Sequence, residues 1–330
     1  MQGRRNIGRF AAIVGTGVVA LGLVIFATVK LTSSPGSANG AVATWETASA
    51  ILEAAATRRD QEEWAEALAI YREGVETFPK DQAIRLAYAE ALLGESDLEG
   101  AFEEFEAASA IGSLDAETHF TAGNVAAMVD RHEVAAVHFA EAQRLDGKDA
   151  RYPLYLGMMQ RQLKQDDEAF ASFSFARTLD PNLAEAHAMI ADIMLGQNKP
   201  KIALQQVRTA RRLEPENLEW RLIEARAYKR DNMPKDALDV LIGVDPAERA
   251  TLPVLTLMEE CYGMLRRPDH AAALWAEASS LKPDDPELAF RAALAFERAN
   301  ALDEARRFAA VAARLGHSDA PDLVQRLGEG

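Results

Sequence analysis

Residues 184–217 read AEAHAMIADIMLGQNKPKIALQQVRTARRLEPEN, and the pattern of this stretch recurs along most of the chain. Its Ala203 belongs to a column of alanines that returns at a constant interval. This column consists of Ala67, Ala101, Ala135, Ala169, Ala203, Ala237, Ala271 and Ala305. A fixed period of about 34 residues is typical of proteins built from stacked supersecondary units. The sequence therefore predicts eight similar repeats in a row.

Three other columns share the period and indicate how each repeat is built. Twelve residues before each alanine, Ala or Gly fills every position except Glu259. Seven residues after each alanine, Ala or Gly fills every position except Val244. Four residues after each alanine stand mostly large apolar residues: Tyr71, Phe105, Phe139, Phe173, Val207, Leu241, Trp275 and Ala309. Small residues suit the points where two helices cross closely, and a large side chain fills the space between neighbouring repeats.

Prolines indicate where the helices of a repeat begin. Pro200, Pro234 and Pro268 lie three residues before the alanines of their repeats, in the first helical turn, where a missing N–H is tolerated. We therefore expect each repeat to be two short antiparallel helices. With its small residues, aromatic position and prolines, the pattern resembles the tetratricopeptide repeat (TPR) family over about residues 48–319. The resemblance implies an all-α fold, a TPR-type α-solenoid in which helix pairs form a right-handed superhelix and each repeat's first helix lines the concave face.

The N-terminus has the features of a membrane anchor. Phe10 to Val29 carry no charge, and a helix of that length spans about 30 Å, the thickness of the bilayer's hydrocarbon core. Arg4, Arg5 and Arg9 precede the run, which favours a cytoplasmic N-terminus and an extracytoplasmic solenoid, periplasmic in a Gram-negative host. The alternative is a cleaved signal peptide and a secreted protein, although the apolar run is longer than usual for one.

These features together predict five segments. They are a cytoplasmic N-terminus over residues 1–9, a single transmembrane helix over 10–31, a flexible Ser-, Gly- and Pro-containing linker over 32–45, a solenoid over 46–319 and a C-terminal capping helix over 318–330.

Composition and motifs argue against several functional classes. The formal net charge of −15 disfavours nucleic-acid binding, and a single cysteine excludes a Cys-rich metal site. The six histidines show no paired spacing, and we find no nucleophile-elbow, phosphate-loop or C-x-x-C motif. We expect no enzyme activity, no cofactor and no metal site.

One stretch of first helices carries more basic residues than the acidic chain would suggest. Only four of the 36 basic residues, and none of the 51 acidic ones, precede Leu31, so the solenoid is strongly acidic. On the predicted concave face of repeats four to six stand Arg151, Tyr155, Met158, Arg161, Met189, Arg226, Lys229 and Arg230. We expect them to form a groove for a protein or an extended, partly apolar and acidic peptide, since Arg binds carboxylates in a bidentate manner and Met and Tyr adapt to apolar groups. The alternative is that they are ordinary surface side chains paired with neighbouring acids.

The sixth repeat is predicted to be irregular. Asp245-Pro246 interrupts its second helix, and Glu259 follows in a column of small residues. A distorted junction is expected over about residues 243–262. It is either a repeat whose sequence has diverged without functional consequence, or a hinge or a notch that binds a partner.

The predicted function is that of a membrane-anchored scaffold or adaptor for protein–protein interactions, supporting assembly of an envelope or secretion complex outside the cytoplasm. The alternative is a periplasmic chaperone or assembly factor for an unfolded client, as in membrane-tethered TPR proteins of cytochrome biogenesis. Contact with the lipid bilayer is expected through residues 10–31 only.

Overall fold

The computed structural model describes residues 45–328, and within them every regular element is an α-helix. The helices are α2 (Ala48–Asp60), α3 (Trp64–Thr77), α4 (Gln82–Gly94), α5 (Leu98–Ile111), α6 (Ala116–Met128), α7 (His132–Leu145), α8 (Arg151–Gln162), α9 (Asp166–Leu179), α10 (Ala184–Gly196), α11 (Pro200–Leu213), α12 (Leu218–Arg230), α13 (Pro234–Ile242), α14 (Pro246–Arg249), α15 (Leu252–Met264), α16 (Pro268–Leu281), α17 (Pro286–Arg298), α18 (Leu302–Arg314) and α19 (Ala320–Gly328).

The predicted N-terminal segments, including the transmembrane helix over 10–31 and nearly all of the linker, lie outside the described residues. Among the helices from α2 to α19, none combines the length and apolar character needed to span a bilayer.

The period predicted from the alanine column is confirmed by the backbone. Within the described residues, eight non-glycine residues adopt positive φ angles of 55° to 64°, one in the turn between the two helices of each repeat. They are Glu62, Ser96, Asp130, Lys164, Asn198, Asn232, Arg266 and Asn300. In each turn the following residue's N–H reaches back to the helix, as Lys199 N does to Met194 O at 2.8 Å. This arrangement is a Schellman motif, which ends the first helix and lets the second fold back antiparallel.

The periodic columns form the core. Ala67, Ala101, Ala203 and Ala305 are fully buried, and the large column from Tyr71 to Ala309 is at most 2% exposed. A methyl group on Gly123 would lie 2.7 Å from the Phe139 ring, which explains the small residue at that position. The packing predicted from the spacing is therefore confirmed.

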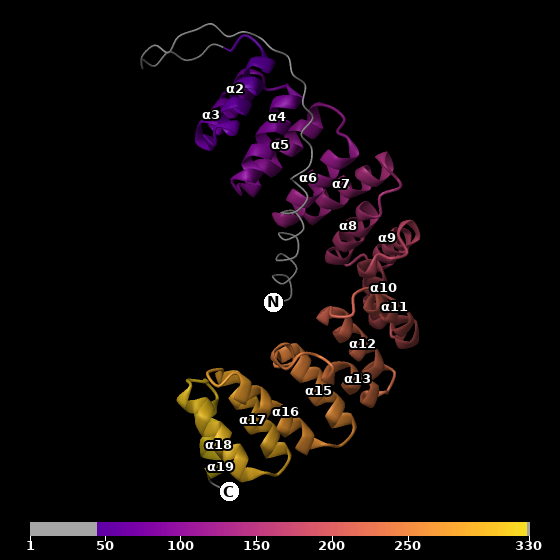
Figure 1. Ribbon diagram of the computed structural model, residues 1–330, viewed down its shortest axis with the longest axis vertical. Helices are drawn as coiled ribbons and strands as arrows, with labels where there is room; N and C mark the ends of the chain where they lie inside the picture. The colour runs from indigo at the N-terminus through magenta and orange to yellow at the C-terminus, as the bar shows by residue number, and fades with distance from the viewer. Residues whose placement is uncertain (1–44, 329–330) are drawn as a thin grey trace. The chain divides into compact units, whose positions relative to one another are not determined.

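The described residues divide into two compact parts between Ala169 and Phe170, inside α9. In the N-terminal part, consecutive helices from α2 to α8 pack against each other (Figure 1). Its core includes Tyr71, Tyr88 and Phe105, which are packed among small residues such as Ala55 and Ala89.

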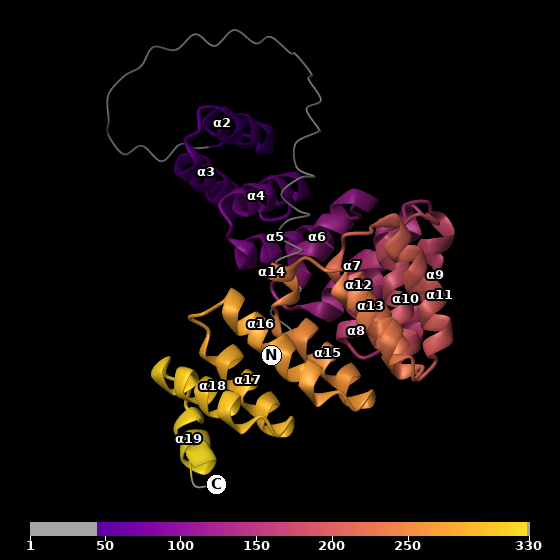
Figure 2. The ribbon, with the colours of Figure 1, turned by 60° about the horizontal axis from the view of Figure 1, so that its bottom comes forward.

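In the C-terminal part, helices α10 to α13 and α15 to α18 repeat the same antiparallel pairing. The short α19 packs on α18 at the end of this part (Figure 2). Leu323 and Leu327 of α19 cover Ala305 and Ala309, and Arg306 Nε donates to Leu327 O at 2.8 Å. The last helix pair therefore has its apolar side covered.

The irregular repeat lies where the sequence places it. Helix α13 has nine residues, whereas the other second helices have 13 or 14. Asp245 then caps the four-residue α14 by accepting from Ala247 N at 2.9 Å. The next helix, α15, has the ordinary 13 residues, so the backbone distortion is narrower than predicted and covers residues 243–251.

Candidate partner-binding site

The predicted groove residues lie on three first helices. Arg151, Tyr155, Met158 and Arg161 belong to α8 in the N-terminal part, Met189 belongs to α10, and Arg226, Lys229 and Arg230 belong to α12 in the C-terminal part. Each part contributes its own surface, and the two sets are described separately.

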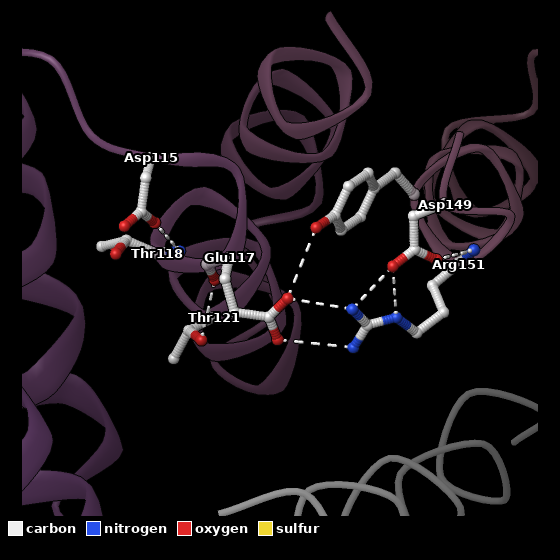
Figure 3. A network of polar contacts seen from close by, with 7 residues as sticks. Asp115, Glu117, Thr118, Thr121, Asp149 and Arg151 are labelled. Carbon is white, nitrogen blue, oxygen red and sulfur yellow. Dashed lines mark hydrogen bonds and ion pairs between the residues drawn. The ribbon is translucent and has the colours of Figure 1, made fainter. Parts of the chain in front are cut away.

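Arg151 is the centre of a polar network at the start of α8 (Figure 3). Its Nε and Nη2 donate to Asp149 Oδ2 at 2.8 and 2.7 Å, and its Nη1 and Nη2 donate to the two oxygens of Glu117 at 3.3 and 2.9 Å. The guanidinium also lies 4.9 Å from the centre of the Phe120 ring. Planar guanidinium groups favour this combination of bidentate carboxylate binding and stacking on an aromatic ring.

Charge and burial shift the pKa values in this network. The hydrogen bonds to Asp149, followed by those to Glu117, raise the pKa of Arg151 against the effect of burial. Burial would raise the pKa of the Asp149 carboxyl, but the bonds from Arg151 outweigh it and lower that pKa. Burial, together with the charge of Glu117, raises the pKa of Tyr152 to about 12. Arg151 thus stays charged and binds the carboxylates of Asp149 and Glu117 while its side chain is half exposed.

The prediction that Tyr155 faces the groove is wrong. Its side chain is buried, and its ring meets Phe120 edge-on with 5.1 Å between centroids and lies 5.5 Å from Phe139. Long side chains of a helix extend back over the preceding turn, so Tyr155 reaches the core between α6, α7 and α8. Met158 and Arg161 are partly exposed, and Arg161 donates to Asp166 at 2.8 Å.

In the C-terminal part the basic side chains lie opposite acidic ones on neighbouring first helices. Arg226 Nη2 of α12 is 3.6 Å from Asp192 Oδ1 of α10, and Lys229 of α12 pairs with Glu260 of α15. Met189 is partly exposed and Arg230 is exposed. These ion pairs agree with the alternative stated from the sequence, in which the cations pair with neighbouring acids. The sequence analysis named no pairs, although Asp192, Arg226 and Glu260 stand in one column of the repeat pattern.

A second feature that the sequence did not reveal is a polar cluster across α5, α6 and α7. His119 and His138 approach each other with 2.9 Å between their Nδ1 atoms, and His138 Nε2 lies 2.7 Å from Glu106 Oε1. A carboxylate only accepts, so His138 donates from Nε2 to Glu106, and of the two facing Nδ1 atoms one donates and the other accepts. Burial, and then the facing His138, lower the pKa of His119. The wide separation of the two histidines in sequence resembles no metal motif, and only the antiparallel pairing of α6 and α7 brings the rings together.

The shortened α13 leaves a pocket of about 390 Å³ in the C-terminal part. Met258 and Leu274 are buried in its floor, while Tyr262 and His270 form one wall with their ring centroids 5.5 Å apart. Arg249 and Glu277 form an ion pair of 2.9 Å at the rim. Because a regular second helix would continue past Ile242, the pocket follows from the break at Asp245-Pro246.

No group of three or more potential metal ligands occurs between residues 45 and 328. Cys261 is buried, and burial raises the pKa of its thiol to about 11, so at neutral pH the thiol stays protonated.

Comparison with known proteins agrees with this architecture. Residues 52–116 match the tetratricopeptide repeat family model. No curated protein matches the chain. Among solved structures, the C-terminal part of a TPR repeat-containing protein from Cytophaga hutchinsonii is 12% identical, with a TM-score of 0.56, and the match covers 72% of this chain and 97% of that one. A tetratricopeptide repeat protein from Parabacteroides merdae is also 12% identical, with a TM-score of 0.55 over 76% of this chain and 99% of that one. These similarities show that the chain has the all-α TPR solenoid fold.

Proposed function

We propose that the chain is a membrane-anchored scaffold that binds partner proteins through its first helices and supports assembly of a complex outside the cytoplasm. The fold provides the basis, because stacked helix pairs present extended surfaces and typically serve protein interaction rather than catalysis. The uncharged run from Phe10 to Val29 supplies the anchor in this proposal, and the arginines before it favour a solenoid beyond the membrane.

The observation that carries the proposal is the position of the cations on the first helices. Arg151 and Arg226 are half exposed, and each already lies against acidic side chains of this chain. Exposed ion pairs contribute only about 0–1 kcal/mol, so a partner's carboxylates can replace the internal ones at little cost. The acidic partner predicted from the sequence is retained on this ground, with Arg151, Arg161, Arg226 and Lys229 as its principal contacts.

Co-purification from gently solubilised native membranes tests the proposal. The test variant changes four cations of the first helices to glutamate, namely Arg151, Arg161, Arg226 and Lys229. A matched control changes four exposed cations elsewhere to glutamate, namely Lys148, Arg212, Lys235 and Arg314. We expect a defined set of partners with the wild type and the control, and its loss with the test variant. Equal recovery from both variants would refute the role of the first helices, and no partner with the wild type would refute the scaffold.

The proposed orientation has a separate test. Protease added outside cells whose outer envelope has been opened should digest the solenoid, while a tag placed before Phe10 should survive. Digestion of the tag without digestion of the solenoid would indicate the opposite orientation, with the solenoid in the cytoplasm.

A further inference from the structure

In the C-terminal part, α15 departs from the repeat pattern at two positions one turn apart. Glu259 occupies a column in which all other repeats carry Ala or Gly. Gly263 occupies a column whose other members are Arg59, Leu93, Ala127, Arg161, Leu195, Lys229 and Glu297. A charged side chain has therefore replaced a small one, and the next turn lacks the side chain that most repeats have.

The structure shows what each departure does. Glu259 Oε2 accepts from Trp275 Nε1 at 3.0 Å, and its Oε1 pairs with Arg298 of α17. A methyl group built on Gly263 would meet no atom within 4 Å. Beside it lies a notch of about 460 Å³, with Pro268, Ala271 and Ala295 among its walls. The notch thus results from small residues at positions where three helices face one another.

Not every charged side chain that lines the notch has a partner of opposite charge. Glu259 accepts a hydrogen bond from Trp275 and forms an ion pair with Arg298, and Glu260 forms an ion pair with Lys229. Arg266 also lines the notch; it is exposed, and its side chain makes no hydrogen bond or ion pair within residues 45–328. It stands at the positive-φ position of the turn that follows α15, so the backbone fixes where this lining side chain begins. The one uncompensated charge of this lining is therefore positive, on a fixed turn beside small apolar walls.

From this geometry we infer that the notch between α15, α16 and α17 binds an acidic side chain of a partner, with Arg266 bonding the Asp or Glu carboxylate and an adjacent apolar residue of the partner filling the space over Gly263. This deepens the proposed scaffold function and rests on it. Guanidinium groups bind carboxylates with two parallel hydrogen bonds, and small apolar walls accept a single aliphatic side chain. The site is separate from the cations of α8 and adjoins those of α12, since its Glu260 pairs with Lys229.

Gly263→Leu provides a test that does not depend on weakening the fold. The position is open and helical, so leucine fills the notch while helix propensity improves by about 1 kcal/mol. Arg266→Glu reverses the charge at the mouth. Arg267→Glu is the matched control, since Arg267 is the exposed next residue and does not line the notch.

The probe is a fluorescent, N-acetylated and C-amidated peptide with one glutamate between two leucines. A comparison peptide has glutamine in place of the glutamate. The full chain in detergent is titrated by fluorescence anisotropy. We expect the wild type and Arg267→Glu to bind the glutamate peptide at least tenfold more tightly than the glutamine peptide. Arg266→Glu should abolish this preference, and Gly263→Leu should weaken binding at least tenfold while its melting temperature stays equal or rises.

The inference would be overturned if the wild type showed no preference for glutamate, if Gly263→Leu left binding unchanged, or if the two arginine variants had equal effects. Tighter binding of a peptide with a free C-terminal carboxylate and no glutamate would also overturn it. If these variants keep the partners that co-purify with the wild type, the scaffold stands without the notch. If the wild type retains no partner, the scaffold itself fails.

Discussion

His119 and His138 face each other through their Nδ1 atoms at 2.9 Å, although 19 residues separate them in the chain. Two imidazolium ions cannot occupy this position, because their charges would repel at hydrogen-bond distance. Burial and the facing His138 lower the pKa of His119 against the opposing charges of Glu141 and Asp115.

The first prediction concerns pH. A histidine whose pKa is lower in the folded than in the unfolded chain takes up its proton preferentially on unfolding, so acid destabilises the fold below the unfolded pKa of about 6.5. We expect His119→Gln to keep a hydrogen-bonding group facing His138 and to lose less stability than the wild type when the pH falls from 7.5 to 5.5.

Urea unfolding at both pH values measures this difference. His270→Gln serves as the comparison, since His270 is an exposed histidine of α16 away from the His119–His138 pair. A wild-type pH dependence in His119→Gln would contradict the prediction.

The second prediction concerns the close approach within one helix pair. Gly123→Ala places a methyl group 2.7 Å from Cε1 of the fully buried Phe139 ring. We expect a loss of about 1–3 kcal/mol in the free energy of unfolding, because the ring has no room to move away. Gly196→Ala, where a methyl group meets nothing within 4 Å, should be neutral or stabilising. Chemical denaturation of both variants decides, and equal stability of the two would disprove the packing argument.

The third prediction concerns the turn inside the first repeat. Glu62 has a φ of 62°, a conformation that costs a non-glycine residue about 1 kcal/mol or more. Glu62→Gly should therefore raise the melting temperature. The neighbouring Gln61 has an ordinary φ of −87°, so Gln61→Gly should lower it through the entropy of the unfolded chain. Calorimetry measures the melting temperature of both variants. Shifts of the same sign would contradict the prediction.

The fourth prediction concerns a buried acid. Glu224 of α12 is 4% exposed and pairs with Arg211 of α11, while Arg208 Nε lies 3.7 Å away. Arg211→Met should cost about 2–3 kcal/mol, because it leaves a buried carboxylate with one weaker partner. Changing Glu224 to Met as well should restore part of the loss, since no buried charge then remains.

Unfolding free energies of the single and double variants measure this difference. Arg212→Met, at the exposed neighbouring position, is expected to stay within about 0.5 kcal/mol of the wild type. A double variant less stable than Arg211→Met would show that the ion pair does not act as argued.

Much of the fold could be predicted because helix packing imposes its period on the sequence. Ala203 and its equivalents must be small where helices cross, and Pro200 must stand in a first turn, so both constraints are visible in the residues themselves. The candidate site was less predictable. Tyr155 and Arg151 share one helix, yet one is buried among aromatic rings and the other binds carboxylates at the surface.

The sequence by itself determined the repeat period, the helical class, the break at Asp245-Pro246 and the cationic character of the first helices. These properties depend on local spacing and on side-chain size, which a chain displays before it folds. Only the tertiary structure decided which charges are compensated, which histidines meet and where a notch opens. Arg226 meets Asp192, and Ala271 of α16 and Ala295 of α17 form a notch beside Gly263 of α15, because neighbouring helices place these residues together in space.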